Sequence, residues 1–278
     1  MFPFVYDFRW DTTSLVFLGT FFSVVAVVAL MVTAASLRSL KNLRGRKIEA
    51  IRWHDMFEDL PAPARACRFS ISGSARGRVC HNSFECGGCQ MFPHLRAWEQ
   101  HHRDQHEEVD IRSLGFNLHD DRLYHRGHTW VRQEEDGTCL IGLDDFAKRL
   151  LGPTPSIHLP PVGSTLELHG VAFTVQSGIS TVRVISPMEG EVIEIGSSEQ
   201  DWLMRVRPAE EPADTKHLLD GRDARRWIEF EMERLHQLIE NPGVGATLAD
   251  GGTPVEDFSE MRPGTDWDGV LGMMMLDV

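Results

Sequence analysis

Four of the five cysteines lie close together in the chain, and their spacing indicates a metal site. They are Cys67, Cys80, Cys86 and Cys89. The last two flank two glycines in the run CHNSFECGGC, so one tight turn can direct two thiolates at a single ion. All four together would complete the tetrahedral all-sulfur set of a structural zinc site. Such a site would stabilise the surrounding fold and leave no open position for catalysis.

Three other interpretations of these cysteines stay open. Cys86 and Cys89, followed by His102 and His106, also fit a two-cysteine, two-histidine zinc site. The same four thiolates suit an iron–sulfur cluster. The cysteines are alternatively unligated, with a redox-active pair at Cys86 and Cys89. Cys139, in the apolar run TCLIGL, is expected to be a core residue.

The sequence contains no motif for enzymatic chemistry that we can identify. It has no nucleophile elbow, phosphate loop, HExxH pair or dinucleotide fingerprint. The run EQHHRDQHEE, residues 99–108, is typical of a solvated helix face, and we interpret His125 and His128 as the start of a domain. A net charge of -13, from 41 acidic and 28 basic residues, opposes binding to nucleic-acid phosphates. We therefore predict a protein that is not an enzyme and does not bind nucleic acid.

Residues 15–37 form an apolar stretch without a charged side chain. As a helix this stretch would span roughly 34 Å, enough to cross a bilayer core. Basic residues cluster only on its C-terminal side: Arg38, Lys41, Arg44, Arg46 and Lys47. The positive-inside rule then places the C-terminal part in the cytoplasm. We predict a single-pass protein of the inner (cytoplasmic) membrane.

Composition divides the chain into six segments. They are a short extracytoplasmic N-terminus (1–14), a transmembrane helix (15–37), a basic juxtamembrane linker (38–66), a four-cysteine metal-binding knuckle (67–110), a β domain (115–240) and an acidic Gly/Pro-rich tail (241–278). Within the β domain, residues 214–240 have the periodicity of a helix. The tail is expected to be disordered, with an apolar end, LGMMML, that either docks on a partner or packs on the protein's own surface.

The β domain is identified by an ordered set of short motifs. They are the H-x-W-V strand at residues 128–131, Asp136-Gly137, Gly142 with Asp145-Phe146-Ala147, Leu151-Gly152, residues 159–163, Ser186-Pro187 with Gly190-Glu191-Val192, and Trp202-Leu203. This set resembles the glycine-cleavage H protein, a member of the lipoyl-domain group, over roughly residues 115–240. The resemblance implies a mainly β fold: a flattened lipoyl-type β barrel (barrel-sandwich hybrid) of two quasi-symmetric halves, with flanking helices.

The chain departs from the family at one hairpin. The resemblance implies that the hairpin at residues 171–185 displays a lysine whose amine forms an amide with lipoate. Alignment back from Pro187 places Ile179 at that position, and no lysine occurs between Lys148 and Lys216. Arg183 cannot replace it, because its guanidinium stays protonated. We therefore expect neither lipoate nor biotin on this hairpin.

These observations favour a membrane-anchored, non-lipoylated H-protein-like adaptor or scaffold subunit of a membrane-associated complex. Its protein partner would contact the hairpin tip, residues 177–181, and the C-terminal tail. An iron–sulfur or redox-sensing subunit of an electron-transfer complex is one alternative. A lipoyl carrier of glycine cleavage is another, which the missing lysine opposes.

Overall fold

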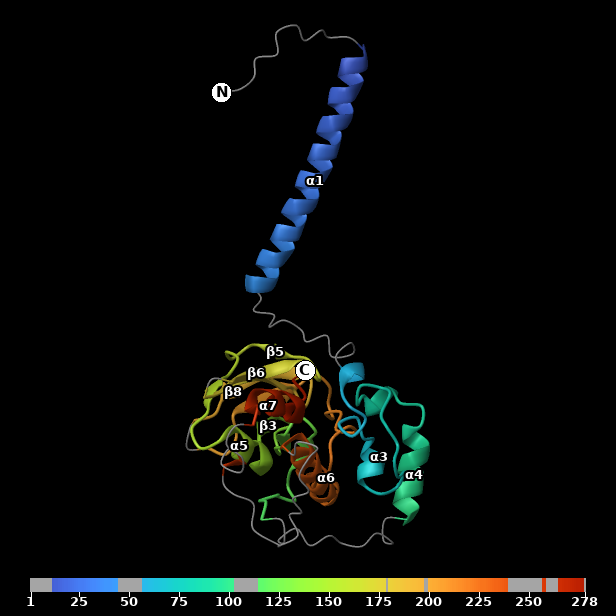
Figure 1. Cartoon of the computed structure of the whole chain (residues 1–278), viewed down its shortest axis with the longest axis vertical. Coiled ribbons are helices and arrows are strands. Elements are labelled where there is room, and N and C mark those ends of the chain that lie inside the picture. The colour runs from blue at the N-terminus through green and yellow to red at the C-terminus, as the bar shows by residue number, and fades with distance from the viewer. Residues whose placement is uncertain are drawn as a thin grey trace. The chain divides into compact units, whose positions relative to one another are not determined.

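A computed structural model gives the arrangement of these segments. It describes residues 12–44, 57–102, 115–178, 180–197, 200–239, 257–258 and 265–277. The chain divides into two compact units, Met1–Ile48 and Glu49–Val278. The first unit contains one long helix, and the second contains the β-sheets and the remaining described helices (Figure 1).

The long helix is α1, Thr12–Arg44. Its segment Leu15–Ala34 has a mean hydropathy of 2.7, and none of that segment is buried within the protein. A helix that is apolar on every side has no polar face to turn toward water. Among the described residues, α1 is the one helix that is long and apolar enough to cross a membrane.

The second unit is built on two antiparallel sheets. The larger sheet has the strand order β1-β2-β3-β9-β8-β5, and the smaller has the order β4-β6-β7. The strands are β1 Leu123–His125, β2 Thr129–Gln133, β3 Cys139–Leu143, β4 Ser156–His158, β5 Thr165–Leu166, β6 Val171–Ser177, β7 Ser180–Ile185, β8 Gly190–Ile195 and β9 Met204–Pro208. The mainly β fold expected from the sequence is confirmed.

The flattened lipoyl-type arrangement expected from the sequence is present, but its two sheets remain separate and do not close into a barrel. The chain passes between them at two corners, before β6 and after β7. There His169 N–H donates to Ser186 O at 3.0 Å, and Ser186 N–H donates to Gly170 O at 2.6 Å. His169 has a φ of 60°, a conformation that no regular strand adopts. The strand ladders are therefore interrupted at these corners, and the sheets meet there without closing.

Two helices cover the core between the sheets. Helix α5, Asp145–Leu151, begins where the Asp144 carboxylate accepts the Ala147 N–H, a typical N-cap. Helix α6, Gly221–Ile239, begins after Asp220, whose carboxylate accepts the Asp223 N–H. The sequence predicted this second helix from residue 214. It starts later because Leu219 pairs with Tyr124 as an extended bridge.

The last described segment is helix α7, Trp267–Met275. Figure 1 shows it in red beside α5 and α6, and it also contacts β7. Met274 and Met275 are fully buried in the main core, and Asp277 accepts hydrogen bonds from the Arg183 backbone N–H and Nε at 2.7 and 2.6 Å. The expectation of a disordered tail is therefore wrong for residues 265–277, because burial of their apolar side chains stabilises a helix on the protein's own surface.

Residues 57–102, which we call the cysteine segment, belong to the same unit as the sheets. Their elements are α3 Arg68–Ile71, the 3-10 turn η1 Cys86–Gly88 and α4 Phe92–His102. The Arg68 guanidinium joins the segment to the start of α6, because it donates to Leu218 O at 3.1 Å and pairs with Asp223 at 3.1 Å. The segment is thus fixed against the β domain.

Candidate functional site

Cys67 and Cys80 lie on two short extended stretches that pair with each other. Ala66 and Val79 form an antiparallel bridge. On either side of it, Cys67 N–H donates to Arg78 O at 2.9 Å and Cys80 N–H donates to Arg65 O at 2.7 Å. Side chains opposite each other in such a pair share a face, as do those two positions apart. Cys67 and Cys80 therefore project to the same side.

Cys86 and Cys89 are the ends of a single tight turn. Cys89 N–H donates to Cys86 O at 3.3 Å, across the two glycines of η1. Burial raises the pKa of the Cys86 thiol to about 11, and the neighbouring thiols of Cys80 and Cys67 add to that rise. Cys86 thus lies close enough to Cys67 and Cys80 to interact with them electrostatically. All four cysteines are free and partly exposed.

The four-cysteine zinc site remains a prediction. The group of described side chains whose metal-binding atoms all lie within 4.8 Å of one another consists of histidines, not of these cysteines. In the alternative mixed site, His102 stacks on Trp98 at 4.2 Å, and its Nδ1 lies 2.8 Å from Trp98 O. His106 lies outside the described residues.

Three buried histidines, which we call the histidine trio, form that group. They are His125 at the end of β1, His169 at the corner before β6 and His217 in the turn before α6. Their exposed fractions are 1%, 0% and 3%, and their ring centroids lie 5.2 to 5.9 Å apart. Burial, reinforced by the other two rings, lowers the pKa of His125 well below its usual value, and burial lowers the pKa of His217. Both rings are therefore neutral at pH 7.

Phe84 and Arg126 connect the cysteine segment to the histidine trio. The Phe84 ring lies 6.3 Å from His169, edge to face, and the Arg126 guanidinium lies over Phe84 at 3.8 Å. Arg126 is 5% exposed, and its Nε and Nη1 have no hydrogen-bond partner in the described part of the chain. Burial lowers the pKa of Arg126, whereas Cys86, Cys80 and Cys67 raise it. The buried guanidinium thus interacts electrostatically with three of the four cysteines.

His128, which begins the H-x-W-V strand, lies in a separate buried network. Its Nδ1 is 3.0 Å from Asp144, and its Nε2 is 3.7 Å from Glu231. The ring stacks between Phe146 at 4.6 Å and Trp227 at 4.7 Å. Burial alone would lower the pKa of His128, but the two carboxylates outweigh it and raise the pKa to about 9. His128 thus connects the start of β2 to the N-cap of α5 and to α6 through buried ionic contacts with Asp144 and Glu231.

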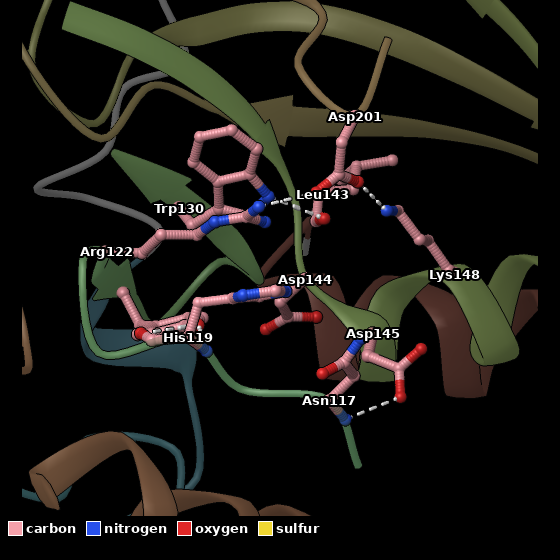
Figure 2. Close-up of a pocket in the computed structure, with 10 residues that line it drawn as sticks. Asn117, His119, Arg122, Trp130, Leu143, Asp144, Asp145, Lys148 and Asp201 are labelled. Atoms are coloured by element: carbon pink, nitrogen blue, oxygen red, sulfur yellow. Dashed lines mark hydrogen bonds and ion pairs between the residues drawn. The ribbon is translucent and has the colours of Figure 1, made fainter. Parts of the chain in front are cut away.

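A small polar pocket of about 50 Å³ holds one of the few lysines (Figure 2). Lys148, on α5, pairs with Asp201. Arg122 also pairs with Asp201, at 2.7 Å, and lies over the Trp130 ring at 4.0 Å. Although burial opposes the effect, Lys148 and Arg122 hold the pKa of Asp201 below its usual range. The Lys148 amine is therefore already engaged in an ion pair.

The β6–β7 hairpin ends in a tight turn. Ser177 pairs with Ser180 across it, and Gly178 has a φ of 59°, which favours glycine. Ile179, the residue at the expected lipoyl position, lies outside the described residues. The turn borders a groove of about 530 Å³ that it shares with the end of α5 and the start of α7. The lining of this groove includes Asp257, Asp266 and Asp268 but no lysine.

Comparison with known proteins connects this domain to a family. The family model described as glycine cleavage H-protein matches residues 122–198. The glycine cleavage system H protein of Alkalilimnicola ehrlichii is 34% identical over 117 residues, which cover 37% of this chain and 89% of that protein. The glycine cleavage system H protein 2 of Pseudomonas syringae pv. tomato is 31% identical over 117 residues, which cover 38% of this chain and 91% of that protein. A solved glycine cleavage system H protein from Mycobacterium marinum is 21% identical, with a TM-score of 0.34, and the match covers 42% of this chain and 98% of that structure.

The two sheets with their flanking helices thus form a lipoyl/H-protein-like domain. The chain belongs to the glycine cleavage H-protein family. Its α1 helix and its cysteine segment lie outside the residues that the family model matches.

Sequence reasoning missed the histidine trio. His125 was interpreted only as the start of the domain, and His169 and His217 stand far from it in the chain with no regular spacing. Only the corner at His169 and the bridge between Leu219 and Tyr124 bring the three rings together. No local pattern in the sequence predicts such a cluster.

Proposed function

We propose that this chain is a membrane-anchored member of the H-protein family that acts as a non-lipoylated adaptor. The observation that carries the proposal is the absence of any lysine between Lys148 and Lys216. Amide attachment of lipoate needs a lysine amine at the exposed hairpin tip. The tip instead reads Ser177-Gly178-Ile179-Ser180. A domain of this family that lacks the attachment lysine can still bind a protein partner through its surface, but it cannot carry a lipoyl group.

The lysines on either side do not replace the missing amine. Lys148 lies on a helix and is paired with Asp201 (Figure 2). Lys216 lies in the turn before α6, with its amine 3.7 Å from Asp214. Neither side chain stands at the tip of a hairpin. This placement supports an adaptor over a carrier.

The N-terminal helix supports a location at the inner membrane. The apolar span of α1 has the length that a bilayer requires, and the basic residues that follow it favour a cytoplasmic location for the H-protein domain. The adaptor would thus hold a cytoplasmic partner close to the membrane, through contacts that include the hairpin tip.

We also propose that Cys67, Cys80, Cys86 and Cys89 bind one zinc ion as a structural site. Arg126 supports this assignment, because a buried cation is costly without a nearby anion. The groups that favour its charge are Cys86, Cys80 and Cys67. Four thiolates on one zinc ion carry a net charge of two minus, which would supply the missing counter-charge. Metal analysis that finds iron with sulfide would contradict this assignment.

Intact-mass analysis tests the absence of lipoate. The full chain, purified in detergent from cells with an active lipoylation system, should show no lipoyl adduct. The variant Ile179→Lys restores an amine at the tip and should gain the adduct, which would verify that the cells and the fold permit the reaction. An adduct on Lys148 or Lys216 of the unaltered chain would refute the adaptor proposal.

A second experiment tests the contact at the tip. Ile179→Asp should abolish co-purification of the membrane-associated partner in mild detergent. Val162→Asp is the matched control, because Val162 is another apolar side chain in a turn and is 60% exposed. Equal recovery of the partner with both variants would remove the hairpin tip from the contact.

A further inference from the structure

We propose that His125, His169 and His217 bind one divalent transition-metal ion, of which Zn²⁺ is the probe, at a second site inside the H-protein domain. The site is distinct from the four cysteines, and it is independent of whether the hairpin carries lipoate. Its ligands come from three segments that the fold brings together: the end of β1, the corner before β6 and the turn before α6.

The geometry of the trio is close to that of a metal site. The three donor atoms lie within 4.8 Å of one another. Three nitrogens on one zinc ion, each at about 2.0–2.1 Å in tetrahedral geometry, lie about 3.3 Å apart. Side-chain movements of about 1 Å would therefore complete the site. Because all three rings are at least 97% buried, water does not compete freely for their nitrogens.

His217 already has the hydrogen bond that metal-binding histidines usually make. Its Nε2–H donates to Pro187 O at 2.7 Å. This bond fixes the ring proton on Nε2 and leaves the lone pair of Nδ1 available. A metal-bound histidine commonly donates its other N–H to a carbonyl or carboxylate in this way. The geometry therefore assigns Nδ1 as the ligand atom of His217.

His125 must change tautomer when the metal binds. Its Nδ1 accepts the Gly127 N–H at 3.0 Å, so the neutral ring carries its proton on Nε2. That buried Nε2 has no hydrogen-bond partner among the described residues. Binding through Nε2 moves the ring proton to Nδ1 and ends the bond to Gly127. After this change the Gly127 N–H and the new Nδ1–H are both buried donors without that bond, so the bond between the metal and Nε2 must outweigh this loss.

The donor set selects the class of metal. Imidazole nitrogens suit zinc, copper, nickel and iron, whereas calcium and magnesium require oxygen ligands. The trio is the metal-binding group found among the described residues, and it contains no carboxylate. Three protein ligands would leave a fourth position open to a further ligand, as in open zinc sites. Arg126, which adds positive charge near His125 and His217, reduces the affinity without removing the ligands.

X-ray absorption on a cysteine-site variant tests the proposal. The full chain with Cys86→Ser and Cys89→Ser, stripped of metal in detergent and given one equivalent of Zn²⁺, should bind one ion per chain. The first shell of this ion should contain only nitrogen and oxygen, at about 2.0–2.1 Å, with no sulfur shell at about 2.3 Å. No bound zinc, or a shell that contains sulfur, would overturn the proposal.

Histidine variants in the same background identify the ligands. His169→Ala and His217→Ala should each reduce the zinc content from one ion per chain to near zero. His158→Ala is the matched control, because His158 is an exposed histidine of the same domain, and it should leave the content unchanged. Zinc retained in full by both trio variants would contradict the assignment.

A third measurement uses no histidine variant, so its result does not depend on whether such a variant folds. Nitrogen NMR of the Cys86→Ser, Cys89→Ser chain distinguishes the two tautomers of a histidine ring. Addition of Zn²⁺ should move the His125 proton from Nε2 to Nδ1 while His217 keeps its proton on Nε2. An unchanged His125 tautomer at saturating Zn²⁺ would refute the site. Failure here would leave the lipoate proposal intact, because that proposal depends only on intact mass.

Discussion

The cysteine segment and the histidine trio are two proposed metal sites in opposite settings. The cysteines are partly exposed and lie between residues 67 and 89, on short turns with few regular elements. The histidines are buried and lie between residues 125 and 217, at positions fixed by two sheets and a helix. A site of the first kind depends on its metal for structure. The core of the domain positions a site of the second kind before any metal arrives.

The largest expected difference between the two sets follows removal of metal. Structural zinc sites contribute on the order of 10 kcal/mol to folding, so Cys86→Ser or a strong chelator should unfold residues 67–89. Hydrogen exchange measured by mass spectrometry should show their amide protection lost, for example at Cys67 and Cys80. The amide of His169, bonded to Ser186 O, should stay protected.

Cys139→Ser is the control for this experiment. Cys139 is buried in β3, outside the cysteine segment, so its substitution should leave the zinc content unchanged. Full protection of residues 67–89 after complete loss of zinc would show that packing alone holds the segment, and the contrast between the two sets would disappear.

The second prediction concerns Phe84, which lies between the two sets. Its ring is 1% exposed and packs against Phe57 at 4.8 Å, His169 and Arg126. Phe84→Ala should lower the free energy of unfolding by about 3–5 kcal/mol, because it opens a cavity between the cysteine segment and the β domain. Urea unfolding followed by circular dichroism measures the loss.

Phe230→Ala is the matched substitution on the surface. Phe230 is 48% exposed on α6, so its removal should cost less than about 1 kcal/mol. Similar small losses for both variants would mean that the cysteine segment and the β domain are packed separately.

The same contrast explains how much the sequence could predict. Apolar length alone identified α1, and the ordered motifs from His128 to Leu203 identified the domain, because both depend on residues near one another in the chain. The sequence did not reveal that the flattened barrel stays open, because the φ of His169 interrupts the ladder at a corner, which a strand pattern does not show. Helix α7 was missed because its apolar residues follow an acidic Gly/Pro-rich stretch, and only contact with β7 and α6 shows their burial.

The third prediction compares His128 with the trio. Asp144 and Glu231 overcome the effect of burial and raise the pKa of His128 to about 9. Histidine in the unfolded chain titrates near pH 6.5, so above this value the unfolded chain loses a proton that the native protein keeps. The stabilisation is therefore complete below about pH 6.5 and is lost as the pH rises through about 9. It amounts to up to about 3 kcal/mol.

Urea unfolding between pH 6.5 and 9 measures this loss. His128→Gln should be less stable at neutral pH, because two buried carboxylates lose their cation, and its stability should no longer fall across this window. His158→Gln, at an exposed position, should keep the slope. An unchanged slope in His128→Gln would assign the alkaline loss to other groups.

The smallest predicted effect lies on the acid side and belongs to the trio. Burial lowers the pKa of His217, so the unfolded chain takes up a proton below about pH 6.5 while the native ring stays neutral. The contribution of His217 to stability is therefore complete above about pH 6.5 and declines as the pH falls. His217→Gln, which keeps a donor for Pro187 O, should remove this part of the acid slope.

In the Cys86→Ser, Cys89→Ser chain, one equivalent of Zn²⁺ should raise the free energy of unfolding at pH 7.5. It should also steepen the loss of stability in acid, because protons compete with the metal for the same nitrogens. The same zinc should change neither quantity once His217 is glutamine, and a zinc effect that survives His217→Gln would place the bound ion elsewhere.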